Sequence, residues 1–152
     1  MLAERQFSLK HFSELSTTEL YRILQLRGEV FVVEQKCNYQ DLDNKDLVAH
    51  HFFLMNEQEC LACCRLLAKG VSYTDYCSIG RVVSSPRVRG QAVGKQMMTQ
   101  AIEEIKKLYP GTPIKISAQA YLQKFYESFG FVWTGEAYLE DDIPHLGMTI
   151  KY

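Results

Sequence analysis

Apolar and polar residues recur along the chain with periods that change from segment to segment. The segment Ser16–Glu19 has capping-box spacing, and the apolar positions after it recur every three or four residues, which predicts a helix over about 17–33. Residues 5–10 alternate weakly and predict a first strand. Two apolar runs, 50–55 and 60–67, flank a short polar segment and predict a hairpin.

The second half of the chain alternates strand and helix patterns. The apolar run 78–84 predicts a central strand, and the stripe from Val93 to Leu108 predicts the strongest helix, which Pro110-Gly111 ends. Shorter patterns predict a strand at 114–117, a helix over 122–129, a strand at 131–134, a turn at 141–144 and a final strand at 148–152. We therefore expect an α/β fold with a central mixed β-sheet flanked by helices, in a single domain over residues 1–152.

Composition and charge argue against several classes of function. The formal net charge of -1 offers no concentrated basic surface for nucleic acid or an acidic membrane. No segment approaches the roughly 18 consecutive apolar residues that cross a bilayer, and the N-terminus lacks the apolar run of a signal peptide. The five cysteines, an odd number without a secretion signal, predict reduced thiols and a cytoplasmic location.

The loop before the long predicted helix has the composition of an anion site. Gly90 and Gly94 allow backbone amides to approach a phosphate, and a helix start presents unpaired amide donors. Arg87, Arg89 and Lys95 add positive charge around the same point. The spacing of the two glycines matches neither the G-x-G-x-x-G pattern of dinucleotide-binding folds nor the P-loop.

A third phosphate-loop pattern fits this segment. Arg89-Gly90-Gln91-Ala92-Val93-Gly94 resembles the R-G-x-G/A-V-G loop of the GNAT acetyltransferase superfamily. Downstream, Phe125-Tyr126-Glu127-Ser128-Phe129-Gly130-Phe131 resembles the second motif of that superfamily, F-Y-x-x-x-G-F. Glycine is more usual at the position of Ala92, and alanine is tolerated there if its φ is negative.

The resemblance narrows to the ElaA-type branch of the superfamily. The segments Leu26–Gln35, Cys37–Asp43 and Glu140–Met148 are similar to that branch, and so is Ala118–Ala120. The likeness therefore covers almost the whole chain.

The resemblance implies direct transfer of an acetyl group from acetyl-CoA to an amine, within a ternary complex. It implies that the pyrophosphate binds the loop residues Arg89, Gly90, Gln91, Ala92, Val93 and Gly94, with Lys95 beside them. It also places Val82, Val83, Ser84 and Gln119 along the cofactor, with a backbone amide near Val83 stabilising the thioester oxygen. Tyr126 matches the general acid for the leaving thiolate, because a phenol is neutral at pH 7.

The general base stays open at this point. An alkyl ammonium has a pKa of about 10, so the acceptor amine must lose a proton before it attacks. Glu34 or His145 is the first choice, and Asp41, Asp43, His50, His51 and Glu140 lie in other segments suited to line the acceptor side. Since His50 and His51 start a predicted strand, alternation turns only one of them inward.

The acceptor itself is defined only by class. Acidic residues in 41–46 and 140–142 favour a cationic acceptor, either a small molecule or a peptide with a primary amine. The alternative function is a non-catalytic acyl-CoA-binding regulatory module that keeps the loop without turnover. A homodimer through the late strands is compatible with the sequence, which does not require it.

Three other motifs that would indicate metal, redox or hydrolase chemistry are incomplete or absent. Cys60-Leu61-Ala62-Cys63 has no second pair, and alternation along a strand sends its two thiols to opposite faces. Asp41-x-Asp43-x-Lys45 begins like a calcium loop but has lysine at the third ligand position. No G-x-S-x-G elbow is present. We therefore expect no metal site and neither redox nor hydrolase chemistry.

Overall fold

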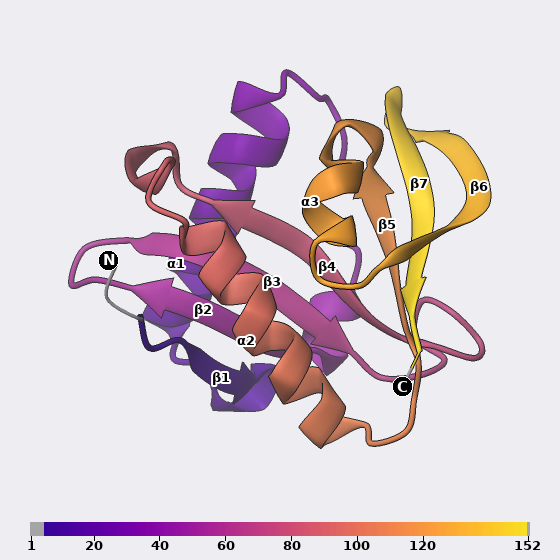
Figure 1. Ribbon diagram of the computed structural model, residues 1–152. Coiled ribbons are helices and arrows are strands. Elements are labelled where there is room, and N and C mark those ends of the chain that lie inside the picture. Colours follow the sequence, from indigo (N-terminus) through magenta and orange to yellow (C-terminus); the bar gives the residue numbers. More distant parts are fainter. Residues whose placement is uncertain (1–4, 152) are drawn as a thin grey trace.

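Seven strands form one mixed sheet within residues 5–151, the part of the chain that this computed structural model describes (Figure 1). The strands are β1 (Ser8–His11), β2 (His50–Met55), β3 (Cys60–Leu67), β4 (Cys77–Ser84), β5 (Ile114–Gln119), β6 (Val132–Glu140) and β7 (Ile143–Ile150). Their order is β1-β2-β3-β4-β5-β7-β6, and β4 with β5 forms the parallel pair among antiparallel neighbours. The predicted α/β fold with a central mixed sheet is confirmed.

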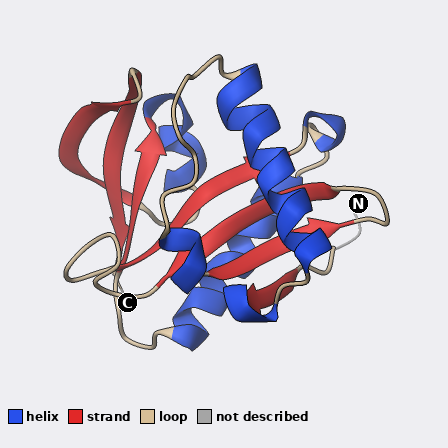
Figure 2. Ribbon diagram, turned by 180° about the vertical axis from the view of Figure 1, so that it is seen from behind, coloured by secondary structure: helices blue, strands red, loops and turns tan. Residues whose placement is uncertain are grey.

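Helices cover both faces of the sheet. The helices are α1 (Thr17–Arg27), which continues as a π-helical segment (Gly28–Glu34), α2 (Val93–Leu108) and α3 (Gln123–Glu127). Figures 1 and 2, which view the molecule from opposite sides, show α2 on one face and α1 on the other. No helix within residues 5–151 is both long and apolar enough to span a membrane.

Strand alternation divides the apolar side chains between two cores. On the α2 face, Phe52 packs in a cluster with Met97. On the α1 face, Phe53 packs in a second cluster with Ile23 and Leu26. Successive strand residues point to opposite faces, so β2 contributes to both cores, and each large side chain buried in this way stabilises the fold by about 1.5–3 kcal/mol.

The ends of the elements differ from the predictions where burial gives no signal. The helix predicted over 17–33 is α-helical to Arg27 and then widens into the π-helical segment. The strand predicted at 131–134 extends to Glu140, and all residues of β6 are exposed, so no apolar alternation marks its length. The short helix predicted over 122–129 is a 3-10 turn followed by α3.

The C-terminal hairpin is tighter than predicted. Its turn consists of Asp141 and Asp142, whose φ angles are 50° and 64°, and β7 starts directly afterwards at Ile143. Two consecutive residues with positive φ are typical of the type I′ turn that joins two-residue hairpins. Tyr152, the end of the predicted final strand, lies outside the described residues.

The prediction that Cys60 and Cys63 point to opposite faces is wrong. The register of β2 and β3 shifts between Leu54 and Met55, so that Leu54 pairs with Ala62 and Met55 with Cys60. The extra residue, Leu61, reverses the alternation, and both thiols join the core on the α1 face. Within residues 5–151, no three His, Cys, Asp or Glu side chains are grouped in a way that could hold a metal ion.

A buried cluster of three arginines and three aspartates joins the helix layer to the sheet. We call it the Arg–Asp cluster, and its members are Arg27, Arg65, Arg81, Asp41, Asp43 and Asp46. Arg27 is 1% exposed and donates to both carboxylate oxygens of Asp46, at 2.7 and 3.1 Å. Arg27 also donates to Asp41 at 2.8 Å.

The Arg–Asp cluster explains the acidity of segment 41–46. Burial by itself would raise the pKa of Asp46, but the hydrogen bonds and charges of Arg27 and Arg65 hold that pKa below its usual value. The same balance lowers the pKa of Asp43 to about 2, through Arg65 above all. These carboxylates are neutralised inside the protein, so they do not support the expected cationic acceptor.

We predict that Arg27→Ala destabilises the fold by about 3–5 kcal/mol, because it removes a fully buried arginine that both Asp41 and Asp46 need in addition to Arg81 and Arg65. Urea unfolding at neutral pH measures this loss. Arg22→Ala on the same helix removes an arginine outside the cluster and should change the free energy of unfolding by less than about 0.5 kcal/mol. A loss below about 1 kcal/mol for Arg27→Ala would contradict the assignment.

Candidate active site

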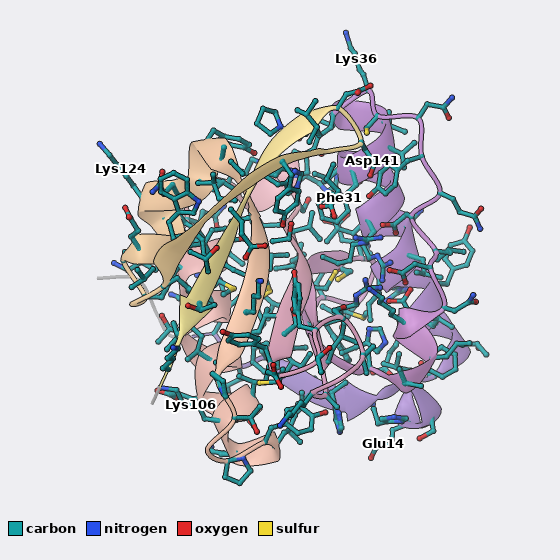
Figure 3. All side chains as sticks on the ribbon, turned by 90° about the vertical axis from the view of Figure 1, so that its right-hand side faces the viewer. Glu14, Phe31, Lys36, Lys106, Lys124 and Asp141 are labelled. Atoms are coloured by element: carbon teal, nitrogen blue, oxygen red, sulfur yellow. The ribbon has the colours of Figure 1, made fainter. Side chains whose placement is uncertain are left out.

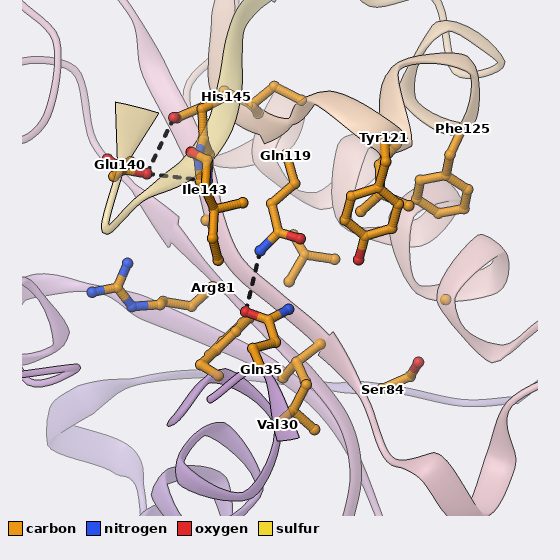
Figure 4. A pocket seen from close by; sticks show the side chains of 18 of the residues that line it. Val30, Gln35, Arg81, Ser84, Gln119, Tyr121, Phe125, Glu140, Ile143 and His145 are labelled. Carbon is orange, nitrogen blue, oxygen red and sulfur yellow. Dashed lines mark hydrogen bonds and ion pairs between the residues drawn. The ribbon is translucent and has the colours of Figure 1, made fainter. Parts of the chain in front are cut away.

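The site begins where two parallel strands part. Among the described residues 5–151, β4 and β5 pair at Cys77–Ile114 and Ser78–Lys115 and nowhere else. Farther along, a cavity of about 500 Å³ lies between them. The π-helical segment, the start of α2, α3 and the β6–β7 hairpin complete its wall (Figure 4).

The hairpin and the segment after α1 close one end of this cavity. Figure 3 shows Asp141, at the hairpin tip, on the same side of the molecule as Phe31 and Lys36. The Cys37 thiol donates to the carbonyl of Asp141 at 3.4 Å. Segments more than 100 positions apart in the sequence therefore meet at the mouth of the cavity.

The predicted anion loop lies at the start of α2. Ala92 is the N-cap, its side chain makes no capping hydrogen bond, and α2 begins at Val93. The first amides of the helix are thus left for another acceptor, at the positive end of the helix dipole. Gly94 and Arg89 line the cavity.

The other loop residues take different positions. Gly90, Gln91, Ala92 and Lys95 are exposed outside the cavity, whereas Val93 is buried in the core. Gly90 has a φ of 81°, which glycine adopts without strain.

The condition under which alanine is tolerated at position 92, a negative φ, is not met. Its φ is 59°, in the left-handed region, because the chain must turn sharply between Gly90 and the start of α2. The loop thus needs a glycine-like conformation at the position where this chain has alanine.

Arg5 supports the loop from outside, which the sequence did not indicate. Its guanidinium donates to the carbonyl of Gln91 at 3.3 Å and to the side chains of Gln91 and Gln96 at 3.2 Å. No local motif links residue 5 to a loop that lies 86 positions later.

Arg89 and Glu34, expected in separate roles, form an ion pair. Arg89 Nη2 lies 2.6 Å from Glu34 Oε1, and the two side chains are 47% and 39% exposed. A pair this exposed contributes about 0–1 kcal/mol, so a bound phosphate can compete for Arg89. The ion pair also occupies both carboxylate oxygens of Glu34, which accept from the arginine at 3.0 and 2.6 Å.

Tyr126 is both a core residue and part of the cavity wall. It is 6% exposed, and its ring packs edge-on against Phe125 and Phe131. Burial raises the pKa of the Tyr126 phenol well above its usual value, so the hydroxyl keeps its proton at neutral pH. Tyr126 lines the cavity, and a protonated phenol can donate a hydrogen bond.

Four of the expected base residues lie away from the cavity. Asp41 and Asp43 are held in the Arg–Asp cluster. His51 is buried and its Nε2 lies 3.0 Å from the Asp46 carbonyl, whereas His50 packs against His11. Alternation therefore turns one histidine inward, as predicted, but neither lines the cavity.

His145 and Glu140 do line the cavity and contact each other. His145 is 8% exposed, and its Nδ1 lies 2.7 Å from the carbonyl of Ile143. A carbonyl only accepts, so Nδ1 donates its proton to Ile143, and Nε2 is the other exchangeable position of the ring. That Nε2 lies 3.3 Å from Glu140 Oε2. Tyr138 stacks on the ring and fixes its plane.

Gln119 reaches across the cavity. Its Nε2 donates to Gln35 Oε1 at 3.4 Å, which links β5 to the end of the π-helical segment (Figure 4). Val82, Val83 and Ser84, which the resemblance places along the cofactor, also line the cavity.

The sequence and the fold were compared with those of known protein families and structures. A family model described as "Acetyltransferase (GNAT) domain" matches residues 17–152. The chain belongs to the GNAT acetyltransferase family. Its sequence is 46% identical to the Escherichia coli protein ElaA over 140 residues, covering 91% of each chain.

Two solved GNAT-type structures are closely similar. The crystal structure of Escherichia coli ElaA has a TM-score of 0.89 at 42% identity and covers 97% of this chain and 100% of that one. An acyl-CoA N-acyltransferase from Pseudomonas aeruginosa has a TM-score of 0.88 at 46% identity and covers 95% and 99%. The expected GNAT superfamily and its ElaA-type branch are confirmed.

Several residues of this GNAT cavity were not predicted as site residues. Gln35, Tyr39, Arg81 and Tyr121 all line it. Arg81 directly precedes Val82, the first strand residue expected along the cofactor. A register shift between β3 and β4 turns Arg81 toward the cavity, and no local sequence pattern indicates such a shift.

We predict that Ala92→Gly raises the free energy of unfolding by about 0.5–1 kcal/mol, because glycine adopts a positive φ without strain. Urea unfolding measures the change. Ala137→Gly in β6 is the matched control and should lower stability by about 0.5–1 kcal/mol, since its backbone gains only unfolded-state freedom. Destabilisation by both variants would mean that Ala92 is not strained.

Proposed function

We propose that this GNAT protein transfers acetyl from acetyl-CoA to a primary amine by direct attack in a ternary complex. One observation carries the proposal: a single cavity is lined by an uncapped helix start, the buried Tyr126 side chain and the His145–Glu140 pair. Each of these groups fits a different step of one reaction.

Acetyl-CoA fits the groups at the start of α2. The pyrophosphate binds the loop Arg89–Gly94, where the uncapped amides and the helix dipole accept an anion, and Lys95 adds charge at the rim. Gln119 and the strand residues Val82, Val83 and Ser84 lie along the rest of the cavity. Bound there, acetyl-CoA supplies the activated acetyl thioester.

Two different residues of the cavity accept and donate the protons of the reaction. His145 Nε2 accepts a proton from the acceptor ammonium, and Glu140 beside it attracts that cation. A backbone amide near Val83 donates to the thioester oxygen as negative charge develops there. Tyr126 gives its proton to the departing sulfur, and His145 is preferred to Glu34 as the base because Glu34 is paired with Arg89.

The decisive experiment measures free thiol released from acetyl-CoA with a panel of polyamines, amino sugars, aminoacyl compounds and peptides. Thiol release that depends on one class of amine supports the enzyme. Tight binding of acetyl-CoA in calorimetry without release from any member would favour the regulatory acyl-CoA-binding module. No binding of acetyl-CoA would contradict both functions.

Two further expectations belong to this proposal. The five cysteines are free thiols, which favours a reducing, cytoplasmic setting. Dimerisation through the late strands stays a prediction, and β6 at the sheet edge exposes Val132, Trp133 and Leu139.

We predict that Tyr126→Phe lowers kcat by about 10²-fold, because the thiolate loses its proton donor, while affinity for CoA changes by less than about threefold. Steady-state kinetics and calorimetry measure the two quantities. Tyr109→Phe, at the opposite end of α2, is the matched loss of a hydroxyl and should leave both unchanged. An equal loss of turnover and affinity would make Tyr126 a structural residue.

We predict that His145→Gln lowers kcat at pH 7 by about 10²-fold, because the acceptor ammonium loses its base. The rate of this variant should rise about tenfold per pH unit toward the amine pKa of about 10, as free amine becomes available without help. Initial rates from pH 7 to 9 measure this dependence. His50→Gln, outside the cavity, should retain the wild-type dependence of rate on pH. If the rate of His145→Gln depends on pH as that of the wild type does, His145 is not the base.

A further inference from the structure

Strand β4 contains one extra residue opposite β3. The register of the two strands shifts between Cys63 and Arg65, so that Arg81 and Val82 both lie opposite Cys64. Arg81 has a φ of 49°, in the left-handed region. That conformation is strained for a residue with a long side chain and persists where the surroundings hold it in place.

The side chain of Arg81 is held from three directions. Its Nη2 donates to the carbonyl of Asp41 at 3.0 Å and lies 3.5 Å from Asp43 Oδ2. Its Nε forms an ion pair with Asp41 Oδ1 at 2.7 Å, although the angle is not that of a hydrogen bond. Its guanidinium also lies 5.8 Å from the centre of the Tyr39 ring.

Asp41 is itself fixed by the rest of the Arg–Asp cluster. Arg27 donates to Asp41 Oδ2 at 2.8 Å and holds Asp46, which Arg65 contacts at 3.1 Å. Arg27 and Arg65 are almost fully buried, and buried charges of this kind are stable only when they are paired. The cluster thus anchors Arg81 to α1 and β3.

The bulge lies where the backbone of β4 faces the cavity. In the described part of the chain, β4 has no ladder pairing with β5 beyond Ser78. Bulges turn backbone and side-chain groups into new directions beside active sites, whereas a one-residue slip reverses every face along the strand. The conformation of Arg81 therefore decides how the amides of Val82 and Val83 are directed.

We propose that Arg81 is a positioning residue, whose contacts with Asp41 hold the β4 bulge so that a backbone amide at Val82 or Val83 points at the thioester oxygen of acetyl-CoA. This inference rests on the proposed function. It gives a role to segment 41–46 that the acidity of that segment did not predict.

Two substitutions at the same position separate bulge geometry from side-chain contact with a substrate. Arg81→Ala should lower kcat by about 10²-fold, while KM for acetyl-CoA stays within about threefold, because the oxyanion donor is misdirected. Arg81→Gly loses the same side chain but adopts the positive φ freely, so its kcat should fall less than about tenfold. Equal losses in the two variants would overturn the proposal and assign Arg81 to acceptor binding.

Asp41→Asn and Arg22→Ala complete the kinetic test with the best amine of the panel. Asp41→Asn should lower kcat as Arg81→Ala does, and combining the two should add little, because both break one contact. Arg22→Ala removes an arginine of α1 outside the cavity and should keep wild-type kinetics. Thermal melts identify any variant that fails to fold, and additive losses in the double variant would overturn the shared role.

A binding measurement keeps this inference separate from the proposed function. The infrared band of acetyl-CoA labelled with ¹³C at the thioester carbonyl should move to lower frequency on binding the wild type, as the hydrogen bond polarises the carbonyl. The shift should be lost in Arg81→Ala and largely kept in Arg81→Gly. An identical band in the wild type and Arg81→Ala overturns the proposal even if acetyl transfer occurs, whereas failure of the amine panel alone affects only the proposed function.

Discussion

The divergence of β4 from β5 is the constraint on which the candidate site depends. The two strands share two residue pairs and then part, while β5 continues along six pairs with β7. Backbone groups on an unpaired stretch of strand need other partners, because buried amides and carbonyls without hydrogen bonds are costly. The gap thus creates both a cavity and a row of backbone groups suited to contact an extended ligand.

Around this gap, the charges are arranged so that most of them neutralise each other before any ligand binds. The Arg–Asp cluster cancels the acidity of segment 41–46, and Arg89 holds Glu34. Glu140 contacts His145, and no lysine or arginine among residues 5–151 pairs with it. The helix start and the hairpin are therefore the two electrostatically distinct ends of the cavity, the first with uncapped amides and the second with the His145–Glu140 pair.

Much of the fold was predictable because it depends on local periodicity. The long stripe of α2 and the alternation of β2 follow directly from burial on one face or on two. The full length of β6 was not predicted, because an exposed edge strand has no buried face and so no apolar alternation. The bulges at Leu61 and Arg81 were not predicted, because the position of an extra residue depends on pairing with the neighbouring strand.

By itself, the sequence determined the family, and it predicted an anion loop at the start of α2 and a catalytic Tyr126, because each depends on short motifs of neighbouring residues. Only the tertiary structure decided which acidic groups remain available to a substrate. Glu34, Asp41 and Asp43 have arginine partners that are 14 to 55 positions away. The Nδ1 of His145 contacts the carbonyl of Ile143, and its Nε2 meets Glu140 across the hairpin. Charges act over distances in space, and the positions of distant partners are settled only when the chain has folded.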